Sequence, residues 1–490
     1  MKRTSGTGLH QERNVTPPTV DPPFSRPTRQ SPAWKRWLVL GFVVLCVGGS
    51  ALFYWLFTAP GRHLVDALAE ADELDPGWRF EELEARRARL ADSENSALVV
   101  LNARALLPKN WTGVDMDSPI ERSLDDLQPQ QQLNNEQILW LQGEREKCAA
   151  ALAEAMKLQA MSRGRYPLRW RRGDPSIVQT SHESRFMALL LQREFLLQAQ
   201  LGEHATAVQA VKALVQLSRS VGDEPLLISQ LARTGNMQLT LRCLERLLAQ
   251  GEYDDTALAP LQALLAEDLT YSAQLVGLRG ERAGNDVRME AVQNGSTTLR
   301  QLVGRRQGTL SELTERVKEG APGYQRACLL HMFNQAVEIA KLPPHEQEEK
   351  FKLLEQSTES MPAAVRLLFP SILAVSTSFH CHDAELRCAI AALAAERYRL
   401  KHNRWPANIE DLVPEFLASV PLDPFTGRPI LLRTTNEGVT VWSVGPDRQD
   451  NEGFVDPELS RRAPGQDLRF RLWNPELRRQ PARLADSEVR

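Results

Sequence analysis

The chain has 490 residues, enough for roughly two to four domains. Hydrophobic residues make up 42% of it, which allows a buried core, and the formal net charge of −3 provides no global positive field for nucleic acid. Because of this charge, we expect no nucleic-acid partner. Six cysteines in 490 residues exclude the class of small secreted proteins held by a dense disulfide framework.

The first 36 residues form a polar, basic segment. They are rich in proline, threonine, serine and glutamine, and their acidic residues are Glu12 and Asp21 alone. Such a composition cannot bury enough apolar surface to offset the chain entropy that is lost on folding. We therefore predict that residues 1–36 are a disordered cytoplasmic tail.

Residues 37–57 form an apolar run without a charged residue. As a helix this run spans about 31 Å, which matches the hydrocarbon thickness of about 30 Å of a bilayer. Trp37 lies at one end and Tyr54 and Trp55 at the other, where interfacial aromatic residues are common. The sequence predicts a single N-terminal transmembrane helix over 37–57, through which the chain contacts the membrane.

The flanks of this run predict its orientation and its processing. Basic residues precede it, whereas Arg62 is the one basic residue of 58–72, where acidic residues follow. The positive-inside rule then places the N-terminus in the cytoplasm. A buried soluble helix and a cleaved signal peptide are the alternatives; the uniform apolarity disfavours the first, and Pro60 after Ala59 disfavours cleavage. We predict an uncleaved signal-anchor in the cell membrane, with a single-pass chain whose body is extracytoplasmic, on the periplasmic side.

Helical periodicity dominates residues 62–375, which we predict to be an extracytoplasmic array of helical hairpins. The stretch 184–265 loosely resembles tetratricopeptide-type repeats, but it has no clean repeat period, so we expect an irregular, helical repeat-like array. Arrays of this kind usually bind partners. The apolar spacing predicts helices over 135–161, 186–201, 205–221, 225–249, 256–288, 299–319 and 324–342, and from residue 346 onward.

A search for catalytic motifs finds none with the spacing that its chemistry requires. The chain lacks a dinucleotide-binding glycine motif, a phosphate-binding loop and a nucleophile elbow. The cluster His380-Cys381-His382-Asp383 holds potential metal ligands, but adjacent residues on a helix point in different directions, so at most two can share one ion. We therefore predict that the protein is not an enzyme.

The C-terminal part, 376–475, reads as a small α+β module. An amphipathic helix over 384–402 is followed by a short helix over 409–417 and by strands over 430–434 and 439–443, which a turn at 436–438 joins as a short antiparallel sheet. Residues 476–490 are predicted to be a disordered tail.

Several motifs of this module resemble the globular head of the major pseudopilin of type II secretion, a type IV pilin-like family. Trp405-Pro406, Asp423-Pro424-Phe425 and the run from Trp442 to Asp447 match the family pattern, although Thr426 is an insertion. The match covers about 80 residues. Cys46 stands where a pilin stem carries its Glu, so the resemblance implies a pilin-like module and not an ordinary pseudopilin subunit.

The resemblance also implies a possible cofactor. In that family the last loop of the head holds calcium, a hard cation that takes six to eight oxygen ligands. The matching residue here is Asp447, and Asp450, Asn451 and Asp467 are further candidate ligands. The alternative is a turn in which these side chains bond their own backbone.

Together these features predict a mainly α protein of the cell envelope: membrane-anchored, non-enzymatic, and presenting a helical interaction surface to a protein partner. An accessory component of a type II secretion or pilus-like system is the alternative, and a hydrolase with an unrecognised site is the second alternative. The segments around 75–79 and 91–101 resemble a family of uncharacterised membrane-anchored bacterial proteins, which implies no activity.

Overall fold

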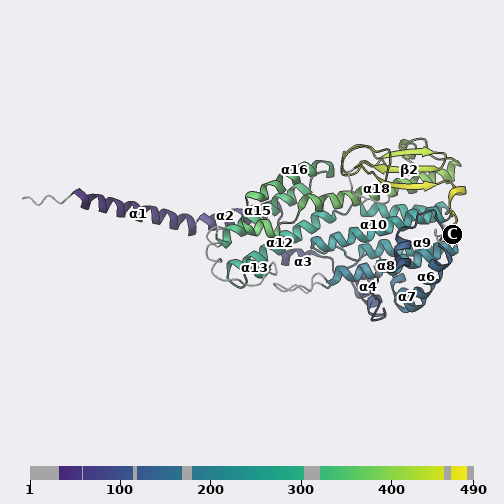
Figure 1. The fold of residues 1–490 in the computed structure, drawn as a ribbon, viewed down its shortest axis with the longest axis horizontal. Helices are drawn as coiled ribbons and strands as arrows, with labels where there is room; N and C mark the ends of the chain where they lie inside the picture. The colour runs from purple at the N-terminus through teal and green to yellow at the C-terminus, as the bar shows by residue number, and fades with distance from the viewer. Residues whose placement is uncertain are drawn as a thin grey trace, which may run out of the picture. The chain divides into compact units, whose positions relative to one another are not determined.

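The computed structural model describes residues 33–57, 59–113, 118–167, 179–302, 321–456 and 465–482. It is mainly helical with one small antiparallel sheet, which confirms the predicted secondary-structure class (Figure 1). The α-helices are α1 (Ala33–Phe57), α2 (Ala59–Leu74), α3 (Phe80–Arg86), α4 (Ser96–Ala105), α5 (Pro119–Asp125), α6 (Asn135–Lys147), α7 (Ala149–Ala155), α8 (Gln179–Leu201), α9 (His204–Arg219), α10 (Leu227–Gln250), α11 (Asp255–Asp268), α12 (Ala273–Gln293), α13 (Leu299–Leu302), α15 (Pro322–Ala340), α16 (Pro344–Ser357), α17 (Ala363–Leu368) and α18 (Ile372–His402). The 3-10 helices are η1 (Asp92–Glu94), η2 (Met156–Ala160), η4 (Thr358–Ser360), η5 (Ile409–Leu412) and η6 (Pro475–Leu477), and the strands are β1 (Leu431–Thr435), β2 (Gly438–Ser443) and β3 (Leu468–Trp473).

Helix α1 belongs to a unit of its own, residues 1–56, and the rest of the chain forms the second unit. The helix ends at Phe57, as predicted, but it begins at Ala33. The prediction of disorder is therefore wrong for residues 33–36, and residues 1–32 lie outside the described part. The large apolar side chains that are described on α1 are exposed, with Trp37 at 72% and Leu45 at 74%.

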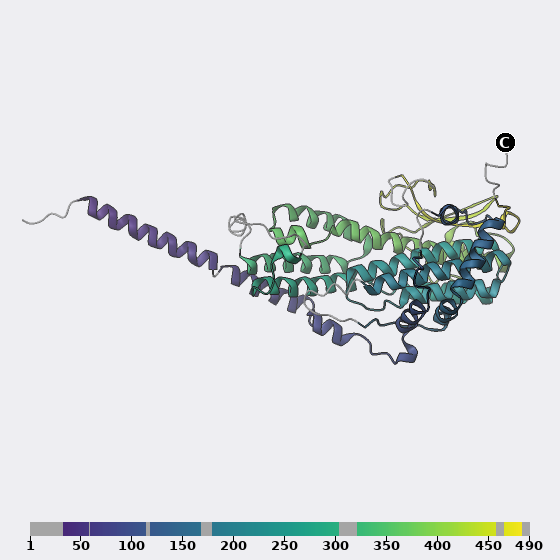
Figure 2. The ribbon, with the colours of Figure 1, turned by 60° about the horizontal axis from the view of Figure 1, so that its bottom comes forward.

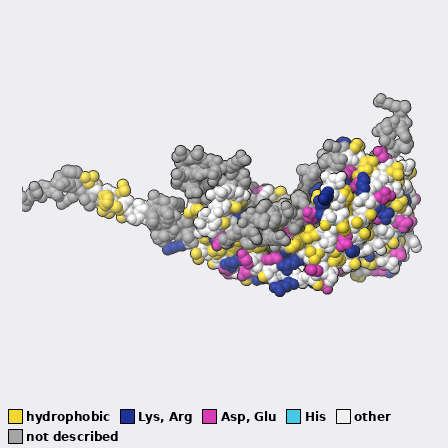
Figure 3. All heavy atoms as spheres, turned by 90° about the horizontal axis from the view of Figure 1, so that it is seen from below, with side chains coloured by type: hydrophobic (Ala, Val, Ile, Leu, Met, Phe, Trp, Pro, Cys, Tyr) yellow, Lys and Arg dark blue, Asp and Glu magenta, His cyan; other side chains and the backbone are white. Residues whose placement is uncertain are grey.

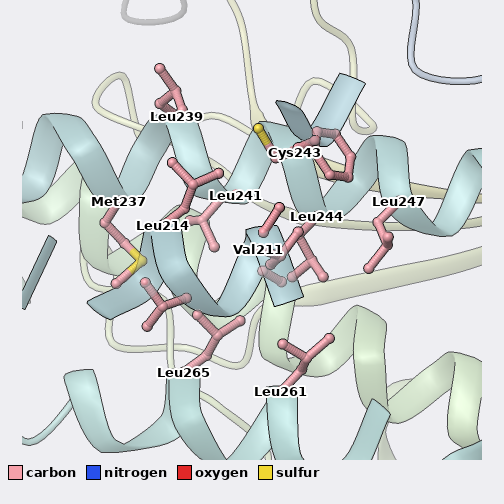
Figure 4. Close-up of a cluster of buried hydrophobic side chains, with 14 of the residues drawn as sticks. Val211, Leu214, Met237, Leu239, Leu241, Cys243, Leu244, Leu247, Leu261 and Leu265 are labelled. Atoms are coloured by element: carbon pink, nitrogen blue, oxygen red, sulfur yellow. The ribbon is translucent and has the colours of Figure 1, made fainter. Parts of the chain in front are cut away.

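The core of the second unit forms around α9. This helix packs against α8, α10 and η2, and its side chains from Ala213 to Arg219 are all buried, so it is enclosed on every side near its C-terminal end. Figure 4 shows the surrounding cluster, in which Val211 and Leu214 of α9 meet Leu244 of α10 and Leu261 of α11. Apolar residues at helical spacing on neighbouring helices thus form one continuous buried interface.

Glycine allows two backbone segments to approach where a side chain would not fit. A Cβ on Gly280 of α12 would lie 1.6 Å from the carbonyl oxygen of Pro225, and a Cβ on Gly164 would lie 2.2 Å from that of Ser220. Both contacts fall on the connection between α9 and α10, so the ends of this connection are fixed by close backbone packing.

Ion pairs and helix packing join α2 to the helices α12 and α15. Asp75, just after α2, pairs with Arg279 at 2.8 Å and also with Arg282, whose side chain is fully buried. The Arg282 guanidinium lies 5.3 Å from the ring centroid of Trp78. Because α2 also packs along α15, the first helix of the second unit is an integral part of its fold.

The C-terminal region is built on α18. The sheet has the order β1-β2-β3, and both pairs are antiparallel, with Leu432 opposite Val441 and Val441 opposite Phe470. β2 and β3 pack against α18, and α10 lies next to β3 (Figures 1 and 2). One buried cluster extends from α9 and α10 through Leu393 of α18 to Phe470, so the helical part and the sheet share a core.

Several predicted elements differ from the observed ones. The helix predicted over 384–402 begins at Ile372 and runs through the predicted module boundary at residue 376. The helix predicted over 256–288 is two helices, α11 and α12, and the helix predicted over 409–417 is the 3-10 turn η5. The predicted strands correspond to β1 and β2. β3 was missed, although Leu468, Phe470 and Leu472 alternate with arginines as a half-buried strand requires.

The prediction of a disordered tail from residue 476 is wrong for residues 476–482. Arg478 is buried, and its Nη2 atom donates to both carboxylate oxygens of Glu396 in α18 at 2.9 Å. Arg479 donates to Ala199 and Gln200 near the end of α8 and to Gln250 at the end of α10. Cations are favourable at helix C-termini, where carbonyl groups lack partners, and this explains why the segment binds there. We call residues 474–482 the C-terminal clasp.

We expect Arg478→Met to destabilise the protein by about 1.5–3 kcal/mol, because it removes one of the two charged partners of the buried Glu396 carboxylate, which keeps its ion pair with Arg399. Chemical denaturation followed by circular dichroism measures the loss. Lys401→Met is the matched control, because it breaks the exposed pair of Lys401 with Glu415 and should change stability little. Equal effects of the two variants would contradict the role of the clasp.

Candidate functional site

A cleft of about 860 Å³ lies between the helical part and the sheet. Its walls come from α5 and the segment that follows it, from α8 and α10, and from β3 and the residues flanking it. The polar lining residues are Asp125, Asp126, Gln128, Gln130, Gln192, Arg242, Glu245, Arg246, Glu385, Asp456, Asp467, Arg469 and Arg471.

Arg246 of α10 fixes one wall of the cleft. Its guanidinium donates to the carbonyl oxygens of Gln128 at 3.1 Å and Gln131 at 2.8 Å, and Gln250 one turn later donates to Pro129 at 2.8 Å. Burial lowers the pKa of Arg246 to about 10. The turn from 128 to 131 is therefore held through its backbone carbonyl groups.

The strand β3 forms the opposite side of the cleft. It is the last strand in the sheet order, so its outer edge faces away from β2. The Arg471 backbone N–H on that edge donates to the Glu245 carboxylate of α10 at 2.9 Å, and the Trp473 carbonyl accepts from Arg478 at 3.0 Å. Side chains of other elements thus occupy backbone positions that a neighbouring strand would use in a wider sheet.

The formal charge of the cleft is acidic. The lining residues include six carboxylates and four guanidinium groups, a net charge of −2. Burial raises the pKa of Asp125, and Arg242 offsets part of this rise. Two of the guanidinium groups bind within the sheet region, Arg471 to Glu437 and Arg469 to the carbonyl oxygen of Gly453. The exposed carboxylates of Asp125 and Asp126 add negative charge to the lining.

The lining residues favour binding over covalent chemistry. They include no Ser, Thr, His, Tyr or Lys, and the one thiol, Cys243, is buried, which raises its pKa to about 12. A nucleophile with an adjacent base is therefore missing from the described walls of the cleft.

On the face seen in Figure 3, charges of both signs are interspersed, as on an ordinary solvated surface.

The four predicted calcium ligands lie in one loop region beside the cleft. Asp447 accepts from the backbone N–H groups of Gln449 at 3.0 Å and Gly465 at 2.7 Å. Asp450 accepts from the indole N–H of Trp442 at 3.0 Å. These carboxylates close the loop by bonding its own backbone and a neighbouring ring.

Asp467 is the most buried of the four and accepts from the backbone N–H groups of Asn451 at 3.1 Å and Gly453 at 2.7 Å. Burial raises the pKa of Asp467 to about 6, and the negative charges of Asp450 and Asp447 add to the rise. The Asn451 side-chain oxygen is buried without a hydrogen-bond partner.

These side chains do not form a calcium cage in this structure. In the described part of the chain, no three His, Cys, Asp or Glu side chains converge as ligands of one metal ion. The unpartnered Asn451 oxygen is a single candidate ligand, and calcium needs six to eight oxygens. Calcium at Asp447, Asp450, Asn451 and Asp467 stays a prediction of the resemblance.

The His380–Asp383 cluster points in several directions, as expected from its place on one helix. His380 contacts Gln347 of α16 at 3.2 Å and the Phe425 ring at 6.0 Å. His382 lies in the field of Asp268 and Arg233, and its Nδ1 atom is buried without a hydrogen-bond partner. Burial lowers the pKa of both histidines to about 4.

Sequence reasoning identified the loop residues but missed the cleft. Glu245 and Arg246 of α10 and Arg471 of β3 are ordinary charged residues in the sequence, separated by more than two hundred positions. The one local signal was the alternation of arginines with apolar residues in β3.

Comparison of the chain with protein-family models, with curated proteins and with solved structures gives no match. The pseudopilin resemblance therefore stays a prediction that is based on the sequence motifs alone.

We expect stability to fall as the pH is lowered from 6.5 toward 4. In that range the unfolded chain binds protons at His380 and His382, whereas the folded chain does not, because burial lowers the pKa of each to about 4. By pH 5 each histidine costs about 2 kcal/mol. Asp383 and Asp467, with pKa values that burial raises to about 6, act in the opposite direction and offset part of this loss.

Urea denaturation at several pH values measures this dependence. The double variant His380→Gln, His382→Gln should flatten it, whereas His402→Gln, at an exposed position, should not. An unchanged pH dependence in the double variant would contradict the assignment.

For calcium, the geometry leads us to expect no saturable binding below about 1 mM, the weak end of protein calcium sites. Calorimetric titration of Ca²⁺ into the full chain measures it. Saturable binding that Asp467→Asn abolishes and Asp92→Asn preserves would instead establish the predicted ligand set.

Proposed function

We propose that the protein is a membrane-anchored, non-enzymatic envelope protein whose helical body binds a protein partner. The observation that carries the proposal is the exposure of the apolar side chains on α1. Phe42 is 69% exposed, Val44 65% and Leu45 74%. Leaving a side chain of this size in water costs about 1.5–3 kcal/mol, which a hydrocarbon environment removes.

The charge distribution around α1 supports an orientation for the anchor. Lys35 and Arg36 lie at its start, and Asp66, Glu70 and Asp72 follow its end. By the positive-inside rule we infer a cytoplasmic N-terminus and an extracytoplasmic body.

A second helical stretch must be weighed against α1. In the described part, Ala363–His402 is the one stretch that is long and apolar enough to cross a membrane, whereas the apolar stretch described within α1, Leu40–Ser50, is shorter. Of the most apolar window in Ala363–His402, 44% is buried inside the protein, and α18 packs against α10, α11, α16 and the sheet. Removing α18 to a membrane would destroy the core, so we interpret it as a core helix.

The body supplies a binding surface and no described catalytic centre. Its cleft has the size of a typical ligand site, which is about 300–1,000 Å³. Its lining offers backbone edges and carboxylates, which recognise a partner by hydrogen bonds and charge. We infer that binding at this cleft is the function of the body, with α1 holding it at the membrane.

The anchor is tested by Val44→Arg, Leu45→Arg in α1. Each arginine at the centre of a membrane helix costs about 2.5–3.5 kcal/mol on insertion scales, so the variant should leave the membrane fraction on carbonate extraction, while the unmodified chain stays. Leu139→Arg replaces another exposed apolar residue, 68% exposed, and should remain in the membrane fraction.

Protease treatment of spheroplasts tests the orientation in the same cells. Digestion of the body supports an extracytoplasmic location. Protection of the body in spheroplasts, with digestion only after lysis, would refute it.

A further inference from the structure

The outer edge of β3 lies at the wall of the cleft. Leu468, Arg469, Arg471 and Trp473 line the cavity, so residues from both ends of the strand border it. In the described part of the chain, β2 is the one strand that pairs with β3. A sheet edge beside a cavity is the geometry in which an extended peptide adds as a further strand.

Glu245 occupies a hydrogen-bonding position that a further strand would use. Its carboxylate accepts the Arg471 backbone N–H at 2.9 Å, where the carbonyl oxygen of a paired strand would lie. A side chain on a helix is displaced more easily than a backbone carbonyl of a regular sheet, because side-chain torsions suffice to move it. At Arg471 the edge is thus capped in the free protein by a group that a ligand can replace, whereas the Trp473 carbonyl stays bound to Arg478.

The segment 128–131, which lines the cleft together with β3, is fixed by hydrogen bonds to its backbone. Arg246 and Gln250 bind the carbonyl groups of the segment 128–131, and the backbone of Gln480 bonds that of Gln130 at 2.7 Å on the side of the clasp. A preformed wall lowers the ordering cost of binding.

The charge of the cleft selects the side chains of its ligand. Asp125 and Asp126 are both exposed at the end of α5, and Arg471 is drawn away to Glu437. The net lining charge of −2 complements lysine or arginine and repels acidic side chains.

We propose that the cleft binds an extended polypeptide segment of a partner protein that carries lysine or arginine residues, and that this segment adds as a strand to the outer edge of β3. The inference rests on the proposed function, because it names the partner chemistry of the same body. Backbone hydrogen bonds to β3 supply affinity, and the carboxylates at the rim supply selectivity. Glu245 leaves the Arg471 N–H when the strand arrives.

The test uses the full chain in phosphatidylcholine nanodiscs and a fluorescent peptide of alternating lysine and valine, with fluorescence anisotropy as the readout. We expect saturable binding that weakens with salt. Asp125→Asn, Asp126→Asn should weaken binding about tenfold, since it removes two of the acidic charges. Asp92→Asn, Glu94→Gln, an exposed acidic pair outside the cleft, is the matched control and should bind as the unmodified chain does.

Two further peptides separate strand addition from simple charge attraction. A lysine-valine peptide that is N-methylated at two adjacent central residues keeps its charge. It loses one N–H donor on each of its two edges, and the methyl groups obstruct pairing there, so it should bind at least tenfold more weakly. A glutamate-valine peptide should not bind. Equal binding of the methylated peptide, or full competition by spermine, would show a site for cations in general and overturn the proposal, as would unchanged binding by the double Asp variant.

The nanodiscs keep the two proposals apart. A chain that enters nanodiscs but does not bind the lysine-valine peptide refutes the strand proposal alone. A chain that binds the peptide but stays outside the nanodiscs refutes the anchor alone. Circular dichroism of each variant confirms that the fold is retained.

Discussion

The buried ion pair between Glu396 and Arg478 connects the parts of the second unit on which the cleft depends. Arg478 joins α18 to the residues after β3, and Arg479 beside it holds the ends of α8 and α10. The same clasp pairs Gln480 with the segment that forms the opposite cleft wall. Helix α10 binds both sides as well, through Glu245 to β3 and through Arg246 to the wall. The last described residues of the chain thus add a second connection between the two sides of the cleft.

Buried charge is used here to hold backbone in irregular conformations. Arg246, Arg478 and Arg479 all donate to backbone carbonyl groups at helix ends or in extended segments, where regular hydrogen-bond partners are missing. Burying a guanidinium group costs free energy, as the lowered pKa of Arg246 reflects, and the carbonyl dipoles offset that cost. Such arrangements add little net stability, but they permit few alternative packings, and a preformed cleft wall requires that property.

The sequence predicted the elements that a local pattern of residues specifies. It missed those that depend on contacts between residues far apart in the chain. Helices α9 and α10 were predicted because their apolar residues recur at helical spacing. The first turns of α18 were missed because β-branched and polar residues there weaken the helical pattern, and burial of Phe379 and Ile372 against other helices stabilises them instead. The cleft was missed because Glu245 and Arg471 meet only through the tertiary fold. The loop carboxylates lie in one region of the fold, yet their hydrogen bonds to the backbone were beyond the reach of a motif.

Hydropathy alone does not decide which helix belongs in a membrane, and the contrast between α1 and α18 shows why. Both helices are long and rich in apolar residues. α18 buries residues such as Leu393 and Ala394 completely and supports the sheet, whereas Leu38 and Leu45 of α1 remain exposed. An apolar surface without a protein neighbour needs another apolar environment, and a lipid bilayer is one that matches its length. Burial therefore assigns α18 to the core, whereas the exposed apolar side chains of α1 support the anchor that we propose.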